Sequence, residues 1–210
     1  MKVCEEFISI QGEGITTGKP SYFLRLFGCN LRCSFCDSKF SFEKSFYNID
    51  PFDFVKSFQD ITRNKLHNIV ITGGEPLLQQ DNIIELIKLL PKNINIEIET
   101  NGTIEQKIES PNCSFNISPK LQFSNKVYID HAKSFIVKFV DDNSEEYRQK
   151  ILEFCYHNSI PNNKVYIMPE GQNIEQMKKH QMSTVEFCIN HEFNYCHRVH
   201  VSLWNGKKGV

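Results

Sequence analysis

Short runs of β-branched and aromatic residues alternate along this chain with longer segments whose apolar residues recur at helical spacing. Runs rich in Ile, Val, Phe and Tyr, with Gly, Pro or Asn nearby, are typical of strands. Six such runs predict strands: Ser21–Phe27, Asn68–Thr72, Ile94–Glu99, Ser114–Ile117, Ser134–Val140 and Lys164–Met168. Between them, apolar residues at helical spacing predict three helices: Phe52–Lys65, Asn82–Leu90 and Ser144–His157.

The alternation of these strands and helices predicts an α/β fold with a mainly parallel sheet. Asp50 and Pro51 precede the first helix as a candidate N-cap and a first-turn proline. No internal repeat or low-complexity linker interrupts the 210 residues. We therefore expect a single domain, residues 1–210.

Charge and hydropathy narrow the class of protein. The net charge is −1, from 24 Lys and Arg against 25 Asp and Glu, which gives no electrostatic reason to expect nucleic-acid or membrane binding. No apolar run approaches the length that spans a bilayer, and residues 1–10 lack the order of a signal peptide. We expect a soluble cytoplasmic protein, in which cysteines are thiols, metal ligands or catalytic groups rather than disulfides.

Three of the eight cysteines, Cys29, Cys33 and Cys36, form a C-x3-C-x2-C run directly after a predicted strand. Three thiolates do not close a structural zinc site, which takes four protein ligands. They suit an iron–sulfur cluster in which one iron stays open to a small molecule. The remaining cysteines are expected to be small buried side chains, although one of them could supply a fourth ligand: Cys4, Cys113, Cys155, Cys188 and Cys196.

Polar and glycine-rich motifs follow several of the predicted strands. They are the cysteine run, Gly73-Gly74-Glu75-Pro76, Thr100-Asn101-Gly102, Ser118-Pro119-Lys120 and Pro169-Glu170-Gly171. Ligands of parallel α/β sheets bind beyond the carboxyl ends of the strands. The recurrence of such motifs at one edge therefore predicts a binding site there.

Several of these residues allow two interpretations. Gly73-Gly74 lets a ligand approach the backbone closely, and Glu75 could accept from a cationic amino group, or the segment could be a plain strand-to-helix turn. Arg25 lies inside an apolar strand and needs an anionic partner, which could be a substrate carboxylate or an internal acidic residue. Ser38 could bind magnesium or cap a turn. His200 and Lys120 are ambiguous when taken alone.

The motifs together resemble those of the radical S-adenosylmethionine enzymes and, more narrowly, the 7-carboxy-7-deazaguanine synthase family of the queuosine and deazapurine pathway. The broad resemblance rests on the cysteine run and Gly73-Gly74-Glu75-Pro76. The narrower one rests on Glu6-Phe7, Ser9-Ile10-Gln11-Gly12-Glu13-Gly14, Arg25–Leu31, Cys36-Asp37, Glu99–Gly102, Ser118-Pro119-Lys120 and Gly209-Val210. Ser38 and Arg198 depart from the family, which usually has threonine and often glutamine at these positions.

The resemblance implies a set of site residues. Cys29, Cys33 and Cys36 would hold a [4Fe–4S] cluster, and Ser38 would bind Mg²⁺. Residues that would bind S-adenosylmethionine are Phe35, Cys36, Asp37, Gly74, Glu75, Ser118, Pro119, Lys120, Ile167, Met168, Pro169 and Glu170. Residues that would bind the substrate are Ile10, Gln11, Gly12, Glu13, Arg25, Thr72, His200 and Val210. No side chain would act as a nucleophile, because the cofactors carry the radical chemistry.

The resemblance also implies a fold, a reaction and partners. The fold would be an incomplete, modified TIM-like barrel of the radical SAM type. The reaction would convert 6-carboxy-5,6,7,8-tetrahydropterin to 7-carboxy-7-deazaguanine with loss of ammonia, through hydrogen abstraction at C6 by a 5′-deoxyadenosyl radical and Mg²⁺-assisted ring contraction. A flavodoxin or ferredoxin would supply electrons, and the enzyme would be a homodimer. The alternatives are a glycyl-radical-enzyme activase and a zinc-stabilised binding module.

Overall fold

The structure is a computed structural model that describes residues 1–34, 36, 38–43, 45–128 and 134–207. Its contacts divide the chain into two compact units. The first unit comprises Met1–Ser9, Pro20–Phe115 and Tyr128–Ser134, and the second comprises Ile10–Lys19, Asn116–Val127 and Phe135–Val210. The prediction of a single domain over residues 1–210 stays a prediction.

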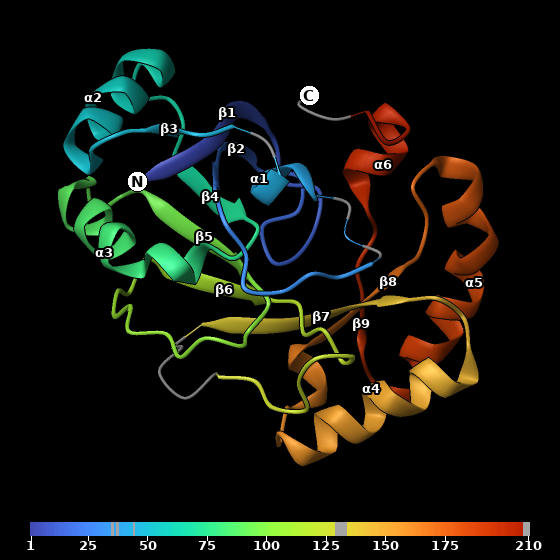
Figure 1. The fold of residues 1–210 in the computed structure, drawn as a ribbon. Coiled ribbons are helices and arrows are strands. Elements are labelled where there is room, and N and C mark those ends of the chain that lie inside the picture. The colour runs from blue at the N-terminus through green and yellow to red at the C-terminus, as the bar shows by residue number, and fades with distance from the viewer. Residues whose placement is uncertain (35, 37, 44, 129–133, 208–210) are drawn as a thin grey trace. The chain divides into compact units, whose positions relative to one another are not determined.

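The first unit is built on a mostly parallel sheet (Figure 1). Its strands follow the order β3-β1-β2-β4-β5-β6, in which β2, β4 and β5 are parallel neighbours and β3 is antiparallel to β1. The elements are β1 (Lys2–Ile10), β2 (Pro20–Leu26), α1 (Phe40–Glu43), β3 (Tyr47–Asn48), α2 (Pro51–Thr62), β4 (Asn68–Gly73), the 3-10 helix η1 (Pro76–Gln79), α3 (Gln80–Leu89), β5 (Asn95–Thr100) and β6 (Cys113–Ile117). Ile10 and the last two residues of β6 belong to the second unit.

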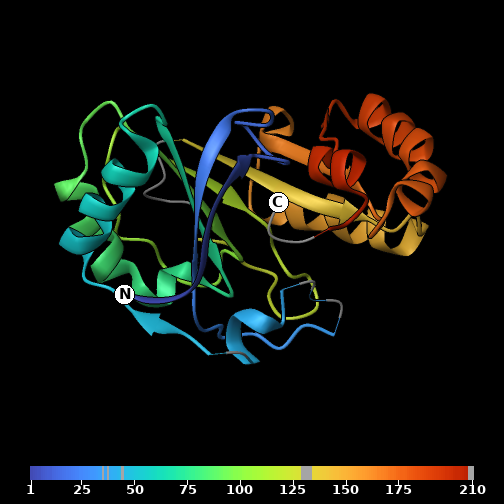
Figure 2. The same ribbon diagram turned by 90° about the horizontal axis from the view of Figure 1, so that it is seen from above.

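Helices α2 and α3 lie side by side in the first unit, as both ribbon views show (Figures 1 and 2). Helix α2 begins as predicted, because the Asp50 side chain accepts a hydrogen bond of 2.8 Å from the backbone N–H of Phe52. Phe54 and Phe58 of this helix are buried and meet Tyr22 of β2 edge to face. The apolar face of the predicted helix therefore forms part of the core.

The second unit continues the pattern of parallel strands joined by helices. Strands β7, β8 and β9 are parallel neighbours in that order. Helix α4 packs on β7, and α5 packs on β8 and β9. The elements are β7 (Phe135–Asp141), α4 (Glu145–His157), the 3-10 helix η2 (Asn162–Lys164), β8 (Val165–Pro169), α5 (Ile174–His191), β9 (Asn194–Tyr195) and α6 (Val199–Trp204).

The predicted α/β organisation is confirmed. Each of the six predicted strands matches an observed strand whose ends differ by at most one residue. The three predicted helices correspond to α2, α3 and α4. Helix α2 stops at Thr62, earlier than predicted, because Arg63 adopts a left-handed backbone with φ of 48°. The sequence interpretation did not identify β1, β3, β9, α1, α5 or α6.

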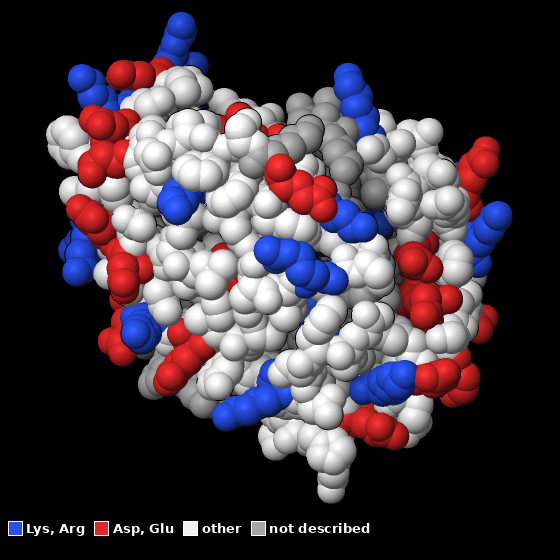
Figure 3. Space-filling model, viewed as in Figure 1, with Lys and Arg blue, Asp and Glu red and all other residues white. Residues whose placement is uncertain are grey.

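The surface and the cysteines agree with the composition. On the face drawn in Figure 3, positive and negative side chains are interspersed. Among the described helices, none combines the length and the apolar character needed to cross a bilayer. All eight cysteines are free thiols, and four of the five outside the C-x3-C-x2-C run are buried, as expected for small apolar side chains.

Candidate functional site

The three clustered cysteines occupy the loop that follows β2. Cys33 is 9% exposed, and Cys29 and Cys36 are partly exposed. The backbone N–H of Leu31 donates to the Sγ atom of Cys29 at 3.4 Å. Burial raises the pKa of the Cys29 thiol, and this hydrogen bond acts in the opposite direction. Within the described residues, the three thiols are not gathered as the ligands of a single metal ion would be.

Gly74 provides a close approach between the end of β4 and the cysteine loop. A Cβ atom at this position would lie 2.4 Å from the carbonyl oxygen of Gly28 and 2.6 Å from the Cβ atom of Cys29. The backbone N–H of Glu75 also donates to the carbonyl of Gly28 at 2.8 Å. Only glycine fits at position 74, so the predicted Gly-Gly turn and the first cysteine are held together.

The Glu75 carboxylate is almost completely buried, with 1% exposure of the residue. It accepts hydrogen bonds from the backbone N–H of Leu77 at 3.0 Å, the Thr100 hydroxyl at 2.8 Å and the backbone N–H of Asn101 at 2.7 Å. These neutral donors place Glu75 at the start of η1 and fix the ends of β4 and β5 together. The carboxylate thus orients protein backbone in this structure.

A chain of amide hydrogen bonds extends this network to the cysteine loop. The Asn101 side chain donates to Oδ1 of Asn30 at 3.0 Å, and Asn30 directly follows Cys29. The Asn30 amide in turn donates to the Thr103 hydroxyl at 2.8 Å. The predicted Thr100-Asn101-Gly102 motif is therefore structural support for the loop that carries the first cysteine.

Arg25 has the internal acidic partner that its sequence position allowed. Its Nε atom donates to Glu5 of β1 at 2.7 Å, and the two side chains are 15% and 34% exposed. Arg25 is also the register partner of Thr72 in the parallel pair of β2 and β4. Because register partners present side chains to the same face of a sheet, these two predicted substrate-binding residues are neighbours. The bond to Glu5 uses Nε and leaves the two terminal nitrogens as the fork that a carboxylate can bind.

Ser38, the predicted magnesium ligand, lies just before α1. The backbone carbonyl of Ser38 accepts a hydrogen bond of 2.8 Å from the N–H of Ser41, which is a residue of α1. Phe35 and Asp37 lie outside the described residues, as does the carboxy-terminal residue Val210 of the second unit.

In the second unit, the segment Gln11–Gly14 bends just before the turn formed by residues 15–18. Gln11 is 4% exposed, and its side-chain oxygen accepts from the backbone N–H of Glu13 at 3.3 Å. Gly14 has a left-handed φ of 77°, and its N–H donates to Sγ of Cys196 at 3.2 Å. A Cβ atom at Gly14 would lie 2.1 Å from the Asn116 side chain. The glycines therefore let this segment pack closely against its surroundings.

Glu13 is the centre of a group of ionisable side chains. Lys138 donates to its Oε2 at 2.8 Å, and the Nε atom of Arg198 donates to Oε1 at 3.1 Å. His200 is 3.7 Å from Oε1. The side chains of Glu13, Lys138 and Arg198 are 17%, 5% and 12% exposed. Burial alone would raise the pKa of Glu13, but the three basic neighbours outweigh it and hold the pKa well below its usual range.

The structure brings together His200 and Gly12, two of the predicted substrate-binding residues. A Cβ atom at Gly12 would lie 2.2 Å from Nδ1 of His200. The backbone N–H of Val199 donates to the carbonyl of Gly12 at 3.0 Å, which attaches the start of α6 to the Gln11–Gly14 segment. Residues far apart in the sequence thus form one compact group with Glu13.

The predicted cofactor segments of the second unit follow β6 and end β8. Lys120 donates to the Ser118 hydroxyl at 2.8 Å across Pro119. Ile167, Met168 and Pro169 are buried residues of β8. The N–H of the following residue, Glu170, donates to the carbonyl of Asp141 at 3.0 Å, so the ends of β7 and β8 are joined.

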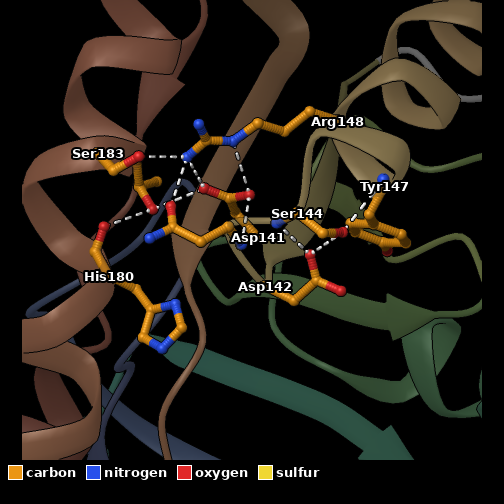
Figure 4. A network of polar contacts seen from close by, with 9 residues as sticks. Asp141, Asp142, Ser144, Tyr147, Arg148, His180 and Ser183 are labelled. Carbon is orange, nitrogen blue, oxygen red and sulfur yellow. Dashed lines mark hydrogen bonds and ion pairs between the residues drawn. The ribbon is translucent and has the colours of Figure 1, made fainter.

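A buried polar network secures the end of β7 (Figure 4). The Arg148 guanidinium donates to both Asp141 oxygens at 3.0 and 2.7 Å, and to Oδ1 of Asn143 at 2.6 Å. It also donates to the hydroxyl of Ser183, while Thr184 donates to Asp141 at 2.8 Å. The network joins β7, α4 and α5, and it supports the strand end that carries the Glu170 hydrogen bond.

Lys138 was missed by the sequence interpretation, although the signal was present. It stands in the middle of the apolar strand Ser134–Val140, just as Arg25 stands in Ser21–Phe27. A buried cation in such a position needs an anion, and here that anion is Glu13. Arg198 was noted as a departure from the family pattern without a role, and its bond to Glu13 was not foreseen.

The chain is similar in sequence to proteins of known family. The sequence profile of the Radical SAM superfamily matches residues 24–182. A 7-carboxy-7-deazaguanine synthase of Clostridium acetobutylicum is 32% identical over 100% of this chain and 99% of its own length. The enzyme of the same name from Pyrobaculum aerophilum is 29% identical over 100% of this chain and 97% of its own length.

Among solved structures, QueE from Escherichia coli matches with a TM-score of 0.72 and 24% identity. The match covers 95% of this chain and 94% of that one. It confirms the predicted fold class, an incomplete, modified TIM-like barrel.

Proposed function

Because the chain belongs to the radical SAM superfamily and, within it, to the 7-carboxy-7-deazaguanine synthase family, we propose that it converts 6-carboxy-5,6,7,8-tetrahydropterin to 7-carboxy-7-deazaguanine with loss of ammonia. It is an enzyme that acts on a small molecule, and its family implies a [4Fe–4S] cluster and S-adenosylmethionine. The single observation that carries the proposal is the fixed contact of Gly74 with Cys29, which joins the two motifs that such chemistry needs.

Cys29, Cys33 and Cys36 are the proposed ligands of the cluster. Three free thiols in one loop, with a backbone N–H directed at the first, are a donor set that fits an iron–sulfur cluster with one open iron. The chemistry that cluster and cofactor supply when bound is abstraction of the hydrogen atom at C6 of the pterin by a 5′-deoxyadenosyl radical. The protein's own contribution is to bind, orient and shield the reactants.

Residues at the strand ends are the proposed contacts of S-adenosylmethionine. Gly74 exposes backbone groups in the turn after β4, where a ligand can approach closely. Glu75 uses its carboxylate to hold that turn, so its contribution to binding is the orientation of this backbone. The other proposed contacts are Phe35, Cys36, Asp37, Ser118, Pro119, Lys120, Ile167, Met168, Pro169 and Glu170.

The proposed substrate contacts include Arg25 and Glu13. The terminal nitrogens of Arg25 would bind the pterin carboxylate in a two-pronged arrangement, next to Thr72. The Glu13 carboxylate, whose pKa is held low by its basic neighbours, would accept from the N–H groups of the pterin ring. Its companions would be Ile10, Gln11, Gly12, His200 and Val210.

We also propose a metal ion, an electron donor, an oligomeric state and a cellular location for the enzyme. Ser38 would supply a hydroxyl ligand to Mg²⁺, which would orient the substrate during the Mg²⁺-assisted ring contraction. A flavodoxin or ferredoxin would deliver the electron. The enzyme would work in the cytoplasm as a homodimer.

An anaerobic assay with the carboxylated pterin, dithionite, Mg²⁺ and S-adenosylmethionine tests the proposal. We expect 7-carboxy-7-deazaguanine and ammonia to form in equal amounts, with S-adenosylmethionine largely recovered. Stoichiometric loss of S-adenosylmethionine without a deazaguanine product would instead favour a glycyl-radical-enzyme activase.

In the same assay, Arg25→Ala tests the proposed role of this residue in binding the pterin carboxylate. Loss of a charge-assisted bond to the substrate carboxylate is expected to raise KM for the pterin by about 10- to 100-fold, while iron content stays unchanged. Lys56→Ala, an exposed substitution on α2, is the matched control and should leave KM unchanged. Unchanged pterin binding in Arg25→Ala would refute the assigned role.

A further inference from the structure

Arg198 connects two segments that the proposed function assigns to different ligands. Its Nε atom donates to Oε1 of Glu13 at 3.1 Å, and Nη1 donates to the carbonyl of Gly171 at 2.6 Å. Gly171 directly follows Ile167–Glu170, the proposed cofactor segment. The Arg198 side chain is only 12% exposed, so both bonds are shielded from water.

The helix that begins after Arg198 is attached to the same two segments. At its start, the N–H of Val199 donates to the carbonyl of Gly12. Past its end, Oδ1 of Asn205 accepts from the N–H of Ile174 at 3.0 Å. A Cβ atom at Gly206 would lie 2.2 Å from the Gln172 carbonyl oxygen, so the chain passes that segment in close contact. Helix α6 thus spans from the Gln11–Gly14 segment to the start of α5.

The Gly171 turn has little freedom to move alone. A Cβ atom at Gly171 would lie 2.4 Å from the backbone nitrogen of Met177, so the turn is pressed against the first turns of α5. The preceding residue, Glu170, is bonded to the carbonyl of Asp141. A displacement of Arg198 therefore acts on a tightly held segment.

We propose that Arg198 is a positioning residue that couples binding of the pterin at Glu13 to binding of S-adenosylmethionine at Ile167–Glu170. The inference rests on the proposed function, which assigns these ligands to these segments. The guanidinium is one rigid plane, so a change at either bond is transmitted to the other. A ligand that shifts Glu13 therefore shifts the Gly171 segment through the guanidinium, and the coupling is reciprocal.

Calorimetric titration of the anaerobically reconstituted protein, without reductant, measures the coupling without turnover. S-adenosylmethionine is titrated with and without saturating pterin. In the wild-type protein, we expect the pterin to lower the Kd for S-adenosylmethionine by about tenfold, within the usual range of coupling between sites.

Two substitutions of Arg198 remove the bridge in different ways. Arg198→Gln removes the charge, and Arg198→Lys keeps a cation beside Glu13 but lacks the fork that reaches both partners. In both variants, we expect the ratio of the two Kd values to fall to about one. Lys138→Gln is the matched control, because Lys138 pairs with the same carboxylate from β7. This control should bind pterin more weakly and keep the ratio.

Hydrogen–deuterium exchange on the wild-type protein gives a second measurement that needs no variant. Saturation with pterin alone should slow exchange in the peptide containing Gly171–Ile174. An unchanged ratio in Arg198→Lys, an equal loss of the ratio in Lys138→Gln, or unchanged exchange in this peptide would overturn the coupling. A wild-type protein that binds both ligands independently would also overturn it, whereas one that binds no pterin would refute the proposed function itself.

Discussion

Two carboxylates, the buried Glu75 of the first unit and the partly buried Glu13 of the second, are stabilised in opposite ways. Glu75 accepts hydrogen bonds from two backbone N–H groups and the Thr100 hydroxyl. Glu13 is bonded to Lys138 and Arg198 and lies near His200. Neutral donors hold Glu75 in place and fix strand ends, while cations keep Glu13 ionised and tie it to distant elements.

The different partners of Glu75 and Glu13 give the two carboxylates different physical properties. Hydrogen bonds to backbone are short-ranged and directional, so the Glu75 network is a rigid support for the turn beside Cys29. Buried ion pairs depend on the balance of charges, so the Glu13 group responds to pH and to any ligand that brings or removes charge. The Glu75 network, the first region, supports the turn beside Cys29, and the Glu13 group, the second region, gathers charged side chains around one carboxylate.

We expect the largest effect from removing one of the three clustered thiols, which lie in the loop supported by the Glu75 network. Cys33→Ala should abolish retention of an iron–sulfur cluster, because two thiolates cannot replace three. Iron and sulfide analysis after anaerobic reconstitution measures it. Cys155→Ala is the control, since burial raises the pKa of that thiol to about 12 and makes it unsuited to ligation. Full cluster content in Cys33→Ala would contradict the assignment.

In the second region, Glu13→Ala should lower the free energy of unfolding by about 3–5 kcal/mol. Its removal leaves Lys138 and Arg198 buried without their shared anion. Urea unfolding gives the value. The double variant Glu13→Ala/Lys138→Met should recover part of the loss, because one of the two stranded charges is gone. Equal stability of the single and double variants would argue against charge balance as the cause.

Glu75→Gln should cost less, about 1–3 kcal/mol in the free energy of unfolding. The glutamine amide would present N–H donors to a site where the backbone of Leu77 and Asn101 already donates. The same unfolding experiment measures it, and iron content should also fall because the turn beside Cys29 loosens. A variant as stable as wild type would show that the network is not a rigid support.

We expect the smallest effect from pH, which should change the contribution of Glu13 to the free energy of unfolding. The pKa of Glu13 is depressed in the folded protein, so its stabilisation is present above the ordinary carboxyl pKa and declines as pH falls below it. The difference in unfolding free energy between wild type and Glu13→Gln should therefore stay constant from neutral pH down to the ordinary carboxyl pKa and shrink on further acidification. A difference that stays constant below the ordinary carboxyl pKa would contradict the depressed pKa.

The sequence predicted the six core strands well because apolar β-branched runs leave few alternatives. Helix α5 was missed, since its buried residues, among them Met177, Thr184 and Phe187, are few and scattered in a polar segment. Strand β1 contains Glu5 and Glu6, whose charges mask a strand pattern. These charges belong to tertiary partners, because Glu5 binds Arg25 and Glu6 accepts from Tyr22.

The sequence named candidate site residues but did not show which of their groups contact one another. Gly74 was predicted as a site of close approach and Gly12 as a substrate contact, and the structure places Cys29 beside Gly74 and His200 beside Gly12. Most partners of Glu75 and Glu13 could not be predicted, because Thr100, Asn101, Lys138 and Arg198 are far away in the sequence. A single sequence shows that a cation within an apolar strand, such as Arg25 or Lys138, needs an anion, but only the fold shows which one.

The most direct test of the central claim, that three thiols hold a cluster with an open iron, is electron paramagnetic resonance of the reduced, anaerobically reconstituted protein with and without S-adenosylmethionine. We expect about four iron atoms and four sulfides per chain, and a spectrum that changes when S-adenosylmethionine is added. A colourless protein holding one zinc ion, or an iron–sulfur spectrum that S-adenosylmethionine does not alter, would contradict it.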